Sequence, residues 1–178
     1  MGVSFRQPTD DDPERIVGWT DSPAALLQWA GSVFSFPLDA AQLRGHLDEI
    51  KDSGSTHRAY AAVVDGRLVG YLELADIDRE NRSARVARVI VDPAERGNGY
   101  GTAMMREVVR IGFDELDLHR IGLRVFDFNE PAIECYETVG FVREGVLRDV
   151  YRHGEEYWSL VTMRCLETER PSGERSGF

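Results

Sequence analysis

Cysteine is scarce in this sequence, and it contains no apolar run of membrane-spanning length. Only Cys135 and Cys165 occur among 178 residues, which is too few for a disulfide framework, and their spacing matches no metal site. No segment approaches the roughly 18 apolar residues that a membrane helix needs. The first residues, MGVSFRQPTDDD, lack the apolar core of a secretory signal. We therefore expect a cytoplasmic protein without a membrane partner.

Positive charge is also in short supply. The chain has 21 Lys and Arg against 31 Asp and Glu, which gives a formal net charge of −10. Nucleic-acid binding needs a basic face, so this balance argues against nucleic acid as a partner. It favours a cationic substrate, although only weakly. The four histidines are scattered without a His-x₃-His pair, so we expect no metal site.

The apolar periodicity changes along the chain and indicates one mixed α/β (α+β) domain. Helix-start and helix-end signals mark the N-terminal third, such as Ser22 before Pro23. Asp65-Gly66 is a strong hairpin signal. The expected order is a strand (3–9), helices (10–19, 22–31, 38–54), a three-strand meander (57–77, 83–93), a helix (102–116), a strand (120–128), a helix (129–140) and a hairpin (145–166). This order predicts a partly antiparallel central sheet flanked by helices, in one domain at 1–166 with a flexible tail at 167–178.

Glycine is concentrated between the predicted strand and helix of VIVDPAERGNGYGTAMM (residues 89–105), at Gly97, Gly99 and Gly101. Such a turn exposes backbone N–H groups at the positive end of a helix, which suits a phosphate. A P-loop would need a lysine after Gly101, and none is present. A dinucleotide fingerprint would need a third glycine where Thr102 stands. Both of these alternatives are therefore disfavoured.

The same stretch resembles the acetyl-coenzyme A loop of the GNAT acetyltransferases, Arg/Gln-x-x-Gly-x-Gly/Ala, with Arg96, Gly99 and Gly101 in place. About 30 residues later, NEPAIECYETVGF (residues 129–141) is similar to that family's Asn-x-x-Ala-x-x-x-Tyr-x-x-x-Gly-Phe helix. The end of the chain is similar to the branch that contains the ribosomal-protein N-terminal and spermidine acetyltransferases. The resemblance covers nearly the whole chain and is strongest from about residue 58.

The resemblance implies a GNAT-like fold and an N-acetyltransferase. Such an enzyme moves an acetyl group from acetyl-coenzyme A to a primary amine (a protein N-terminus, a polyamine or a small amine) by direct attack on the thioester. It implies cofactor contacts at Val89, Ile90, Val91, Arg96, Gly97, Asn98, Gly99, Tyr100, Gly101, Thr102 and Asn129. The alternative is a sensor that binds acetyl-coenzyme A without turning it over. Tyr136 argues against this alternative, because it matches the family's donor to the departing thiolate, and a sensor needs no such donor.

The resemblance also implies catalytic residues. Tyr136 matches the residue whose hydroxyl donates to the departing thiolate. Some relatives carry a Glu base five residues before the Asn, where this chain has Arg124, which cannot accept a proton. Glu73, in an otherwise apolar strand, is the candidate replacement. A base is not essential, because an α-amine of pKa near 8 is roughly a fifth neutral at pH 7.4, against about 0.1% for a lysine-like amine.

Two further expectations concern the surroundings of the site. The family places its acceptor wall in the helical third, where Trp29 and the segment FSFPL (residues 34–38) supply aromatic side chains. These aromatics also suit a hydrophobic core. The exposed edges of such sheets often pair, which leaves a homodimer open.

Overall fold

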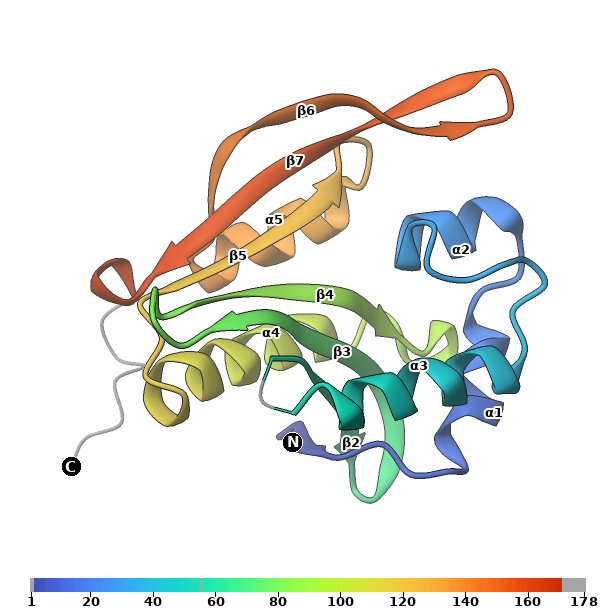
Figure 1. Cartoon of the computed structure of the whole chain (residues 1–178), viewed down its shortest axis with the longest axis horizontal. Coiled ribbons are helices and arrows are strands. Elements are labelled where there is room, and N and C mark those ends of the chain that lie inside the picture. Colours follow the sequence, from blue (N-terminus) through green and yellow to red (C-terminus); the bar gives the residue numbers. More distant parts are fainter. Residues whose placement is uncertain (1, 55, 171–178) are drawn as a thin grey trace.

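A computed structural model describes residues 2–54 and 56–170. Figure 1 shows a central sheet with helices on both faces. Within the described residues the sheet has seven strands in the order β1-β2-β3-β4-β5-β7-β6. Every neighbouring pair is antiparallel except β4 and β5, which run parallel. The partly antiparallel α/β architecture predicted from the sequence is confirmed.

The elements follow the predicted order closely. The helices are α1 (Asp12–Ile16), α2 (Pro23–Ala30), α3 (Ala40–Asp52), α4 (Tyr100–Arg110) and α5 (Glu130–Val139). The strands are β1 (Ser4–Arg6), β2 (Arg58–Val64), β3 (Arg67–Asp78), β4 (Ser83–Val91), β5 (Arg120–Phe126), β6 (Val142–His153) and β7 (Glu156–Leu166). None of the helices in the described ranges is both long enough and apolar enough to cross a membrane.

The capping and turn residues that the sequence indicated adopt the expected conformations. The Ser22 side chain accepts a 3.1 Å hydrogen bond from the Ala25 N–H at the start of α2. Asp65 and Gly66 both have positive φ, 50° and 77°, as the tight turn between β2 and β3 demands. Gly140 ends α5 in the left-handed region, with φ of 116°.

The sheet separates two apolar clusters. On one face α4 and α5 pack on a cluster that includes Met104, Met105 and Ile133. On the other face the helical segment α1–α3 packs around residues such as Leu43 and Tyr71. Each face of the sheet therefore has its own core.

Strands β4 and β5 separate along their length, as Figure 1 shows. They pair only where they begin, over Ser83–Arg85 and Arg120–Gly122. A β-bulge then follows in β4, because three residue steps in β4 face two in β3 between the pairs Glu73–Ala87 and Tyr71–Ile90. Arg88, inside this bulge, has φ of 50°. The bulge and the divergence leave one side of the end of β4 without a strand partner.

The β6–β7 hairpin reaches over this divergence toward α2. A Cβ atom added at Gly31, the residue after α2, would lie 2.7 Å from the Tyr151 hydroxyl of β6. The two segments, far apart in sequence, therefore touch. Gly31 and Tyr151 line the same pocket beside the gap between β4 and β5.

The first residues of the predicted C-terminal tail contact the domain. Residues Glu167–Glu169 form a short 3₁₀ helix. Arg170 is only 9% exposed, and its Nη1 lies 2.7 Å from Oδ1 of Asp114. The first four residues of the predicted tail therefore contact the domain through this ion pair. The rest of that tail, residues 171–178, lies outside the described residues.

Candidate active site

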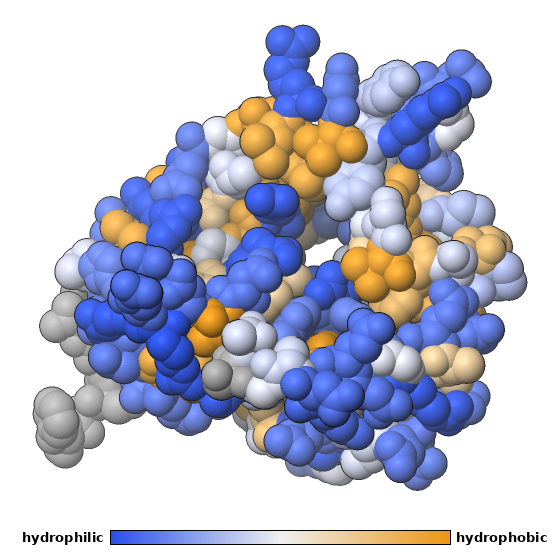
Figure 2. Space-filling view, viewed as in Figure 1, coloured by the Kyte–Doolittle hydropathy of each residue, from blue (hydrophilic) through white to orange (hydrophobic). Residues whose placement is uncertain are grey.

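Two pockets open on the gap between β4 and β5 and share a wall. The larger pocket, of about 590 Å³, is lined by the end of β4 and the beginnings of α4 and α5. The smaller pocket, of about 290 Å³, is lined by α2, β4, β5 and the β6–β7 hairpin. Figure 2 shows the surface hollowed between the hairpin and the helical segment. The side chains common to both pockets are Gln28, Trp29, Val89, Asn129 and Tyr136.

The glycine turn forms one end of the larger pocket. Gly97 and Gly99 have φ of 84° and 78°, so both occupy the left-handed region that glycine tolerates best. Gly99 is the N-cap of α4, and no side chain caps the helix there. The first N–H groups of α4 are therefore free to bind an anion, at the positive end of the helix dipole.

The larger pocket collects almost all of the cofactor contacts that the sequence predicted. It is lined by Val89, Ile90, Val91, Arg96, Gly97, Gly99, Tyr100, Gly101, Thr102 and Asn129. Asn98 is the exception, because its Nδ2 donates a 2.9 Å hydrogen bond to the Glu95 carbonyl and its side chain does not line the pocket. The Asn98 side chain therefore shapes the turn, and the predicted cofactor contact at Asn98 stays a prediction for its main-chain N–H.

Thr20 and Cys135 also line the larger pocket, and sequence reasoning missed both. The Thr20 hydroxyl is buried and has no hydrogen-bond partner among the described residues. Cys135 Sγ lies 3.4 Å from the Thr102 hydroxyl. Arg96 forms no ion pair within residues 2–54 and 56–170. Uncapped N–H groups, an unpaired guanidinium and an orphaned hydroxyl together fit a ligand such as coenzyme A, which carries a pyrophosphate and amides.

Asn129 and Tyr136 lie on α5 at the junction of the two pockets. Asn129 Oδ1 accepts a 3.4 Å hydrogen bond from the Ala132 N–H, so the residue caps the helix that carries Tyr136. The Tyr136 hydroxyl has no hydrogen-bond partner in the described part of the chain. Burial raises the pKa of Tyr136, and the neighbouring Cys135 raises it further. The hydroxyl therefore stays protonated and can donate to a ligand in either pocket.

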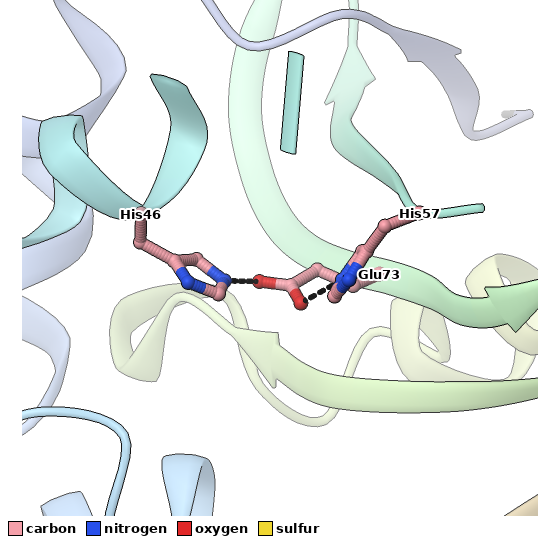
Figure 3. A group of neighbouring side chains, drawn as sticks. All are labelled: His46, His57 and Glu73. Carbon is pink, nitrogen blue, oxygen red and sulfur yellow. Dashed lines mark hydrogen bonds and ion pairs between the residues drawn. The ribbon is translucent and has the colours of Figure 1, made fainter. Parts of the chain in front are cut away.

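Glu73 lies outside both pockets. Its carboxylate is fully buried, and Figure 3 shows His46 of α3 and His57, just before β2, pointing at it from two sides. His46 Nε2 lies 2.7 Å from Oε1, and His57 Nε2 lies 2.7 Å from Oε2. The Tyr71 hydroxyl donates to Oε1 at 2.7 Å, and Arg88 Nε donates to Oε2 at 2.6 Å. Four partners therefore saturate this carboxylate.

This environment makes Glu73 a very weak base. Burial alone raises its pKa, but the hydrogen bonds from His46, His57 and Arg88 outweigh burial and hold the pKa of Glu73 well below its usual value. A saturated carboxylate of such low pKa, away from both pockets, is unsuited to take a proton from a bound amine. The predicted base role of Glu73 is therefore corrected to a structural one, in which it fixes Arg88.

The same cluster bears on the question of a metal ion. In the part of the chain that the structure describes, His46, His57 and Glu73 place their ligand atoms within 4.8 Å of one another. The sequence argument from scattered histidines missed this, because α3 and β2 bring them together only in the fold. The donor set suits a transition metal, but the Arg88 guanidinium already binds the carboxylate, and its positive charge opposes a cation.

The smaller pocket has an unexpected lining. Its charged side chains are Arg85, Arg88 and Arg124, and no Asp or Glu of the described residues lines it. Trp29 forms part of its wall, as predicted, and donates from Nε1 to the Arg88 carbonyl at 2.9 Å. The predicted wall segment 34–38 does not reach the pocket. Instead, Phe34 stacks on Trp29, with ring centroids 5.8 Å apart, and supports it from behind.

Comparison with known proteins gives this arrangement a context. Residues 23–141 match the model of the Acetyltransferase (GNAT) family. The SPbeta prophage-derived uncharacterized N-acetyltransferase YokL of Bacillus subtilis (strain 168) is 31% identical over 138 residues, covering 78% of this chain and 76% of that protein. Spermidine N(1)-acetyltransferase of Escherichia coli (strain K12) is 26% identical over 160 residues, covering 90% and 83%. The crystal structure of spermidine N-acetyltransferase from Vibrio cholerae in complex with CoA and spermine has a TM-score of 0.81 at 24% identity, covering 94% and 96%.

Proposed function

Because this chain belongs to the acetyltransferase (GNAT) family and is an N-acetyltransferase that uses acetyl-coenzyme A, we propose that its two pockets hold the two substrates. Acetyl-coenzyme A occupies the larger pocket, and a primary amine occupies the smaller one. The observation that carries this assignment is that Tyr136 and Asn129 line both pockets. A thioester at this junction can meet an amine that enters from the other side.

The larger pocket offers contacts for the pyrophosphate and the pantetheine arm of coenzyme A. The N–H groups from Gly97 to Thr102, together with Arg96, are placed to bind the pyrophosphate. Strand β4 has no strand partner on its β5 side beyond Arg85, so the main chain of Val89–Val91 is free to pair with the pantetheine amides. The Thr20 hydroxyl supplies one further polar contact.

Tyr136 acts on the leaving group. As the amine nitrogen bonds to the acetyl carbon, the C–S bond breaks and the sulfur keeps the electron pair. Full proton transfer from a tyrosine of pKa about 10 to a thiolate of pKa about 8.5 runs uphill by roughly 2 kcal/mol. Because burial raises the pKa of Tyr136, this gap widens. Tyr136 therefore stabilises the thiolate by a hydrogen bond instead of transferring its proton completely.

No side chain of the smaller pocket acts as a general base in this proposal. Of the described residues that line it, none is an Asp, a Glu or a His. The attacking amine must therefore reach the site neutral, or lose its proton to water. This requirement favours an α-amine over a lysine-like amine, because roughly a fifth of an α-amine is neutral at pH 7.4.

A homodimer through β6 is part of the proposal. Strand β6 is an edge of the sheet and exposes Val142, Val146 and Val150. Two copies of one edge strand can pair antiparallel about a two-fold axis, which covers the open backbone and these side chains. Light scattering on a sizing column should give twice the mass of the chain. A monomer at tens of micromolar would remove this part of the proposal.

The compartment that we propose is the cytoplasm. Cys135 is a free thiol. Free thiols persist in a reducing compartment, and Cys135 lines the larger pocket, where oxidation would interfere with the cofactor. Fractionation of cells followed by detection of the protein tests the assignment.

The experiment that tests the function combines binding with turnover. Thermal shift with acetyl-coenzyme A, coenzyme A, NAD and ATP should show stabilisation by the first two alone. Thiol release is then followed against a panel of primary amines. Stabilisation by acetyl-coenzyme A with no thiol release from any amine would favour a sensor, and stabilisation by NAD alone would contradict the site assignment.

A further inference from the structure

We infer that the acceptor is a small amine that carries a carboxylate, of the amino-acid type, and that Arg124 binds this carboxylate. The inference rests on the proposed function, because it specifies the substrate class of the smaller pocket. It depends on the charge of that pocket, which differs from the charge of the whole chain. The formal net charge of −10 belongs to other surfaces.

Two of the three arginines that line the smaller pocket are already paired with carboxylates. Arg88 is neutralised by the buried Glu73, with Nε and Oε2 2.6 Å apart. Arg85 is paired with Asp76, with Nε and Oδ2 3.1 Å apart. These two carboxylates are therefore already engaged by arginines and are unavailable to a substrate.

Arg124 is the charge that remains. It is exposed, lines the smaller pocket and has no ion pair within the described ranges. The lining thus has an uncompensated positive charge and no acid to oppose it. A planar guanidinium with free donors is the side chain best suited to bind a carboxylate through two parallel hydrogen bonds.

The strand pattern directs Arg124 into the pocket. Its neighbours Leu123 and Val125 are buried in the cluster under α4 and α5, so Arg124 projects from the opposite face of β5. Phe126 follows on that same face, and its ring meets the Tyr151 ring edge-on, with centroids 5.6 Å apart. Arg124 is therefore reachable from solvent at a pocket whose other walls include the aromatic side chains of Phe126 and Tyr151.

This lining does not suit a polyamine. A polyamine has several ammonium groups, which the Arg124 guanidinium would repel, and no carboxylate of the described lining offsets that repulsion. The inference therefore differs from the weak expectation of a cationic acceptor that net charge gave. The volume of about 290 Å³ lies at the lower end of the range for small-ligand pockets, which suits one amino acid.

The reaction leaves the carboxylate unchanged. The neutral amine of the acceptor forms the C–N bond to the acetyl carbon, the C–S bond breaks, and coenzyme A leaves with the electron pair. One N–H proton passes to water. The products are an N-acetylated amino acid and coenzyme A, and Arg124 serves only to bind and orient the acceptor.

The test uses matched acceptors and matched variants. Thiol release is measured with L-amino acids, with their C-terminal amides, and with spermidine, on the wild type and on Arg124→Gln. We expect the wild type to prefer the free acids. In Arg124→Gln, KM for the acids should rise about 10- to 100-fold, the usual cost of losing a charge-assisted pair, with little change in kcat or in KM for the amides. Arg79→Gln, an exposed arginine outside both pockets, should match the wild type.

Each other outcome has a distinct meaning. Faster acetylation of spermidine than of any amino acid, or an unchanged acid-to-amide preference in Arg124→Gln, would overturn the inference and leave the proposed function intact. If acetyl-coenzyme A binds but no amine is acetylated, amino acids are titrated into the complex of the protein with coenzyme A. Calorimetry then measures whether they bind. Binding that Arg124→Gln abolishes supports the inference, and no binding overturns it. Failure of acetyl-coenzyme A itself to bind would contradict the proposed function first.

Discussion

Arg88 Nε donates a 2.6 Å hydrogen bond to Oε2 of Glu73, so a buried carboxylate fixes an arginine that lines the smaller pocket. The backbone of Arg88 is held as well, because its carbonyl accepts from Trp29 Nε1 at 2.9 Å. The φ of 50° at Arg88 lies in the left-handed region, which a residue with a side chain rarely adopts. The bulge that separates β4 from β5 is therefore secured from both the side chain and the main chain.

The first prediction concerns removal of the Glu73 charge. Glu73→Gln keeps the size of the side chain and leaves the Arg88 guanidinium, which is only 11% exposed, without a counter-charge. Breaking a buried ion pair in this way should lower the free energy of unfolding by about 3–5 kcal/mol. Urea denaturation measures it. The matched control is Glu14→Gln, which breaks the exposed Arg44–Glu14 pair and should cost below about 1 kcal/mol. Equal small losses would contradict the structural role of Glu73.

The second prediction is a dependence of stability on pH. The folded-state pKa of Glu73 lies below its unfolded value of about 4.3, so its contribution is fully present above that pH. This stability is lost as the pH falls from about 4.3 toward the folded-state pKa. The groups that face the carboxylate are Tyr71, His46, His57 and Arg88.

Urea denaturation of the wild type and of Glu73→Gln at several pH values checks this dependence. The difference in unfolding free energy between the two proteins should be constant between about pH 5 and 4.5 and then narrow as the pH falls to about 3. The variant serves as the control for every other carboxylate in the chain. A difference that stays constant down to pH 3 would show that Glu73 has an ordinary pKa.

Much of the fold could be predicted because its signals are local. Ser22 before Pro23, Asp65-Gly66 and the apolar periods act over a few residues, and the structure confirms the elements that they indicate. The glycine turn could be predicted for the same reason, since Gly97 and Gly99 need positive φ within one short loop. Asn98 lies in the same loop, but its side chain turns back to Glu95, and spacing alone could not reveal this.

The partners of Glu73 could not be predicted, because they depend on contacts between distant segments. His46 is 27 residues away and His57 is 16 residues away, and only the packing of α3 on the sheet brings them together. The role of Arg124 in the smaller pocket could not be predicted from the sequence for a related reason. Sequence identified it as a departure from the family's pattern, but its free charge is evident only once Asp76 and Glu73 are seen to neutralise the other two arginines.

The third prediction concerns the glycine turn. Gly99→Val places a β-branched side chain at φ of 78°, beside the N–H groups that we propose bind the pyrophosphate. Calorimetry should show that binding of acetyl-coenzyme A is abolished. Gly66→Val is the matched control, because Gly66 has φ of 77°, open space around its Cβ position and no contact with either pocket. Both variants should lose similar stability, about 1–2 kcal/mol, and only Gly99→Val should lose the cofactor. Unchanged affinity in a folded Gly99→Val protein would contradict the loop assignment.

The last prediction concerns the Tyr136 hydroxyl. Tyr136→Phe removes one oxygen atom and keeps the ring at the junction of the two pockets. If the hydroxyl stabilises the departing thiolate, kcat should fall by roughly 10²-fold or more, with an equal fall in kcat/KM, because the interaction forms chiefly in the transition state. Affinity for acetyl-coenzyme A should change little, and steady-state kinetics with calorimetry measures both quantities.

Stability separates this catalytic role from a packing role. Because the Tyr136 hydroxyl has no hydrogen-bond partner in the described part of the chain, its removal breaks no internal bond, and Tm should stay near the wild-type value. Tyr157→Phe, which changes an exposed tyrosine outside both pockets, is the control and should alter neither kcat nor Tm. A Tyr136→Phe protein with wild-type kcat would overturn the catalytic role, whatever its Tm. The thiolate would then have to be stabilised by another donor of the larger pocket, and Thr102 and Cys135 would be the next residues to substitute.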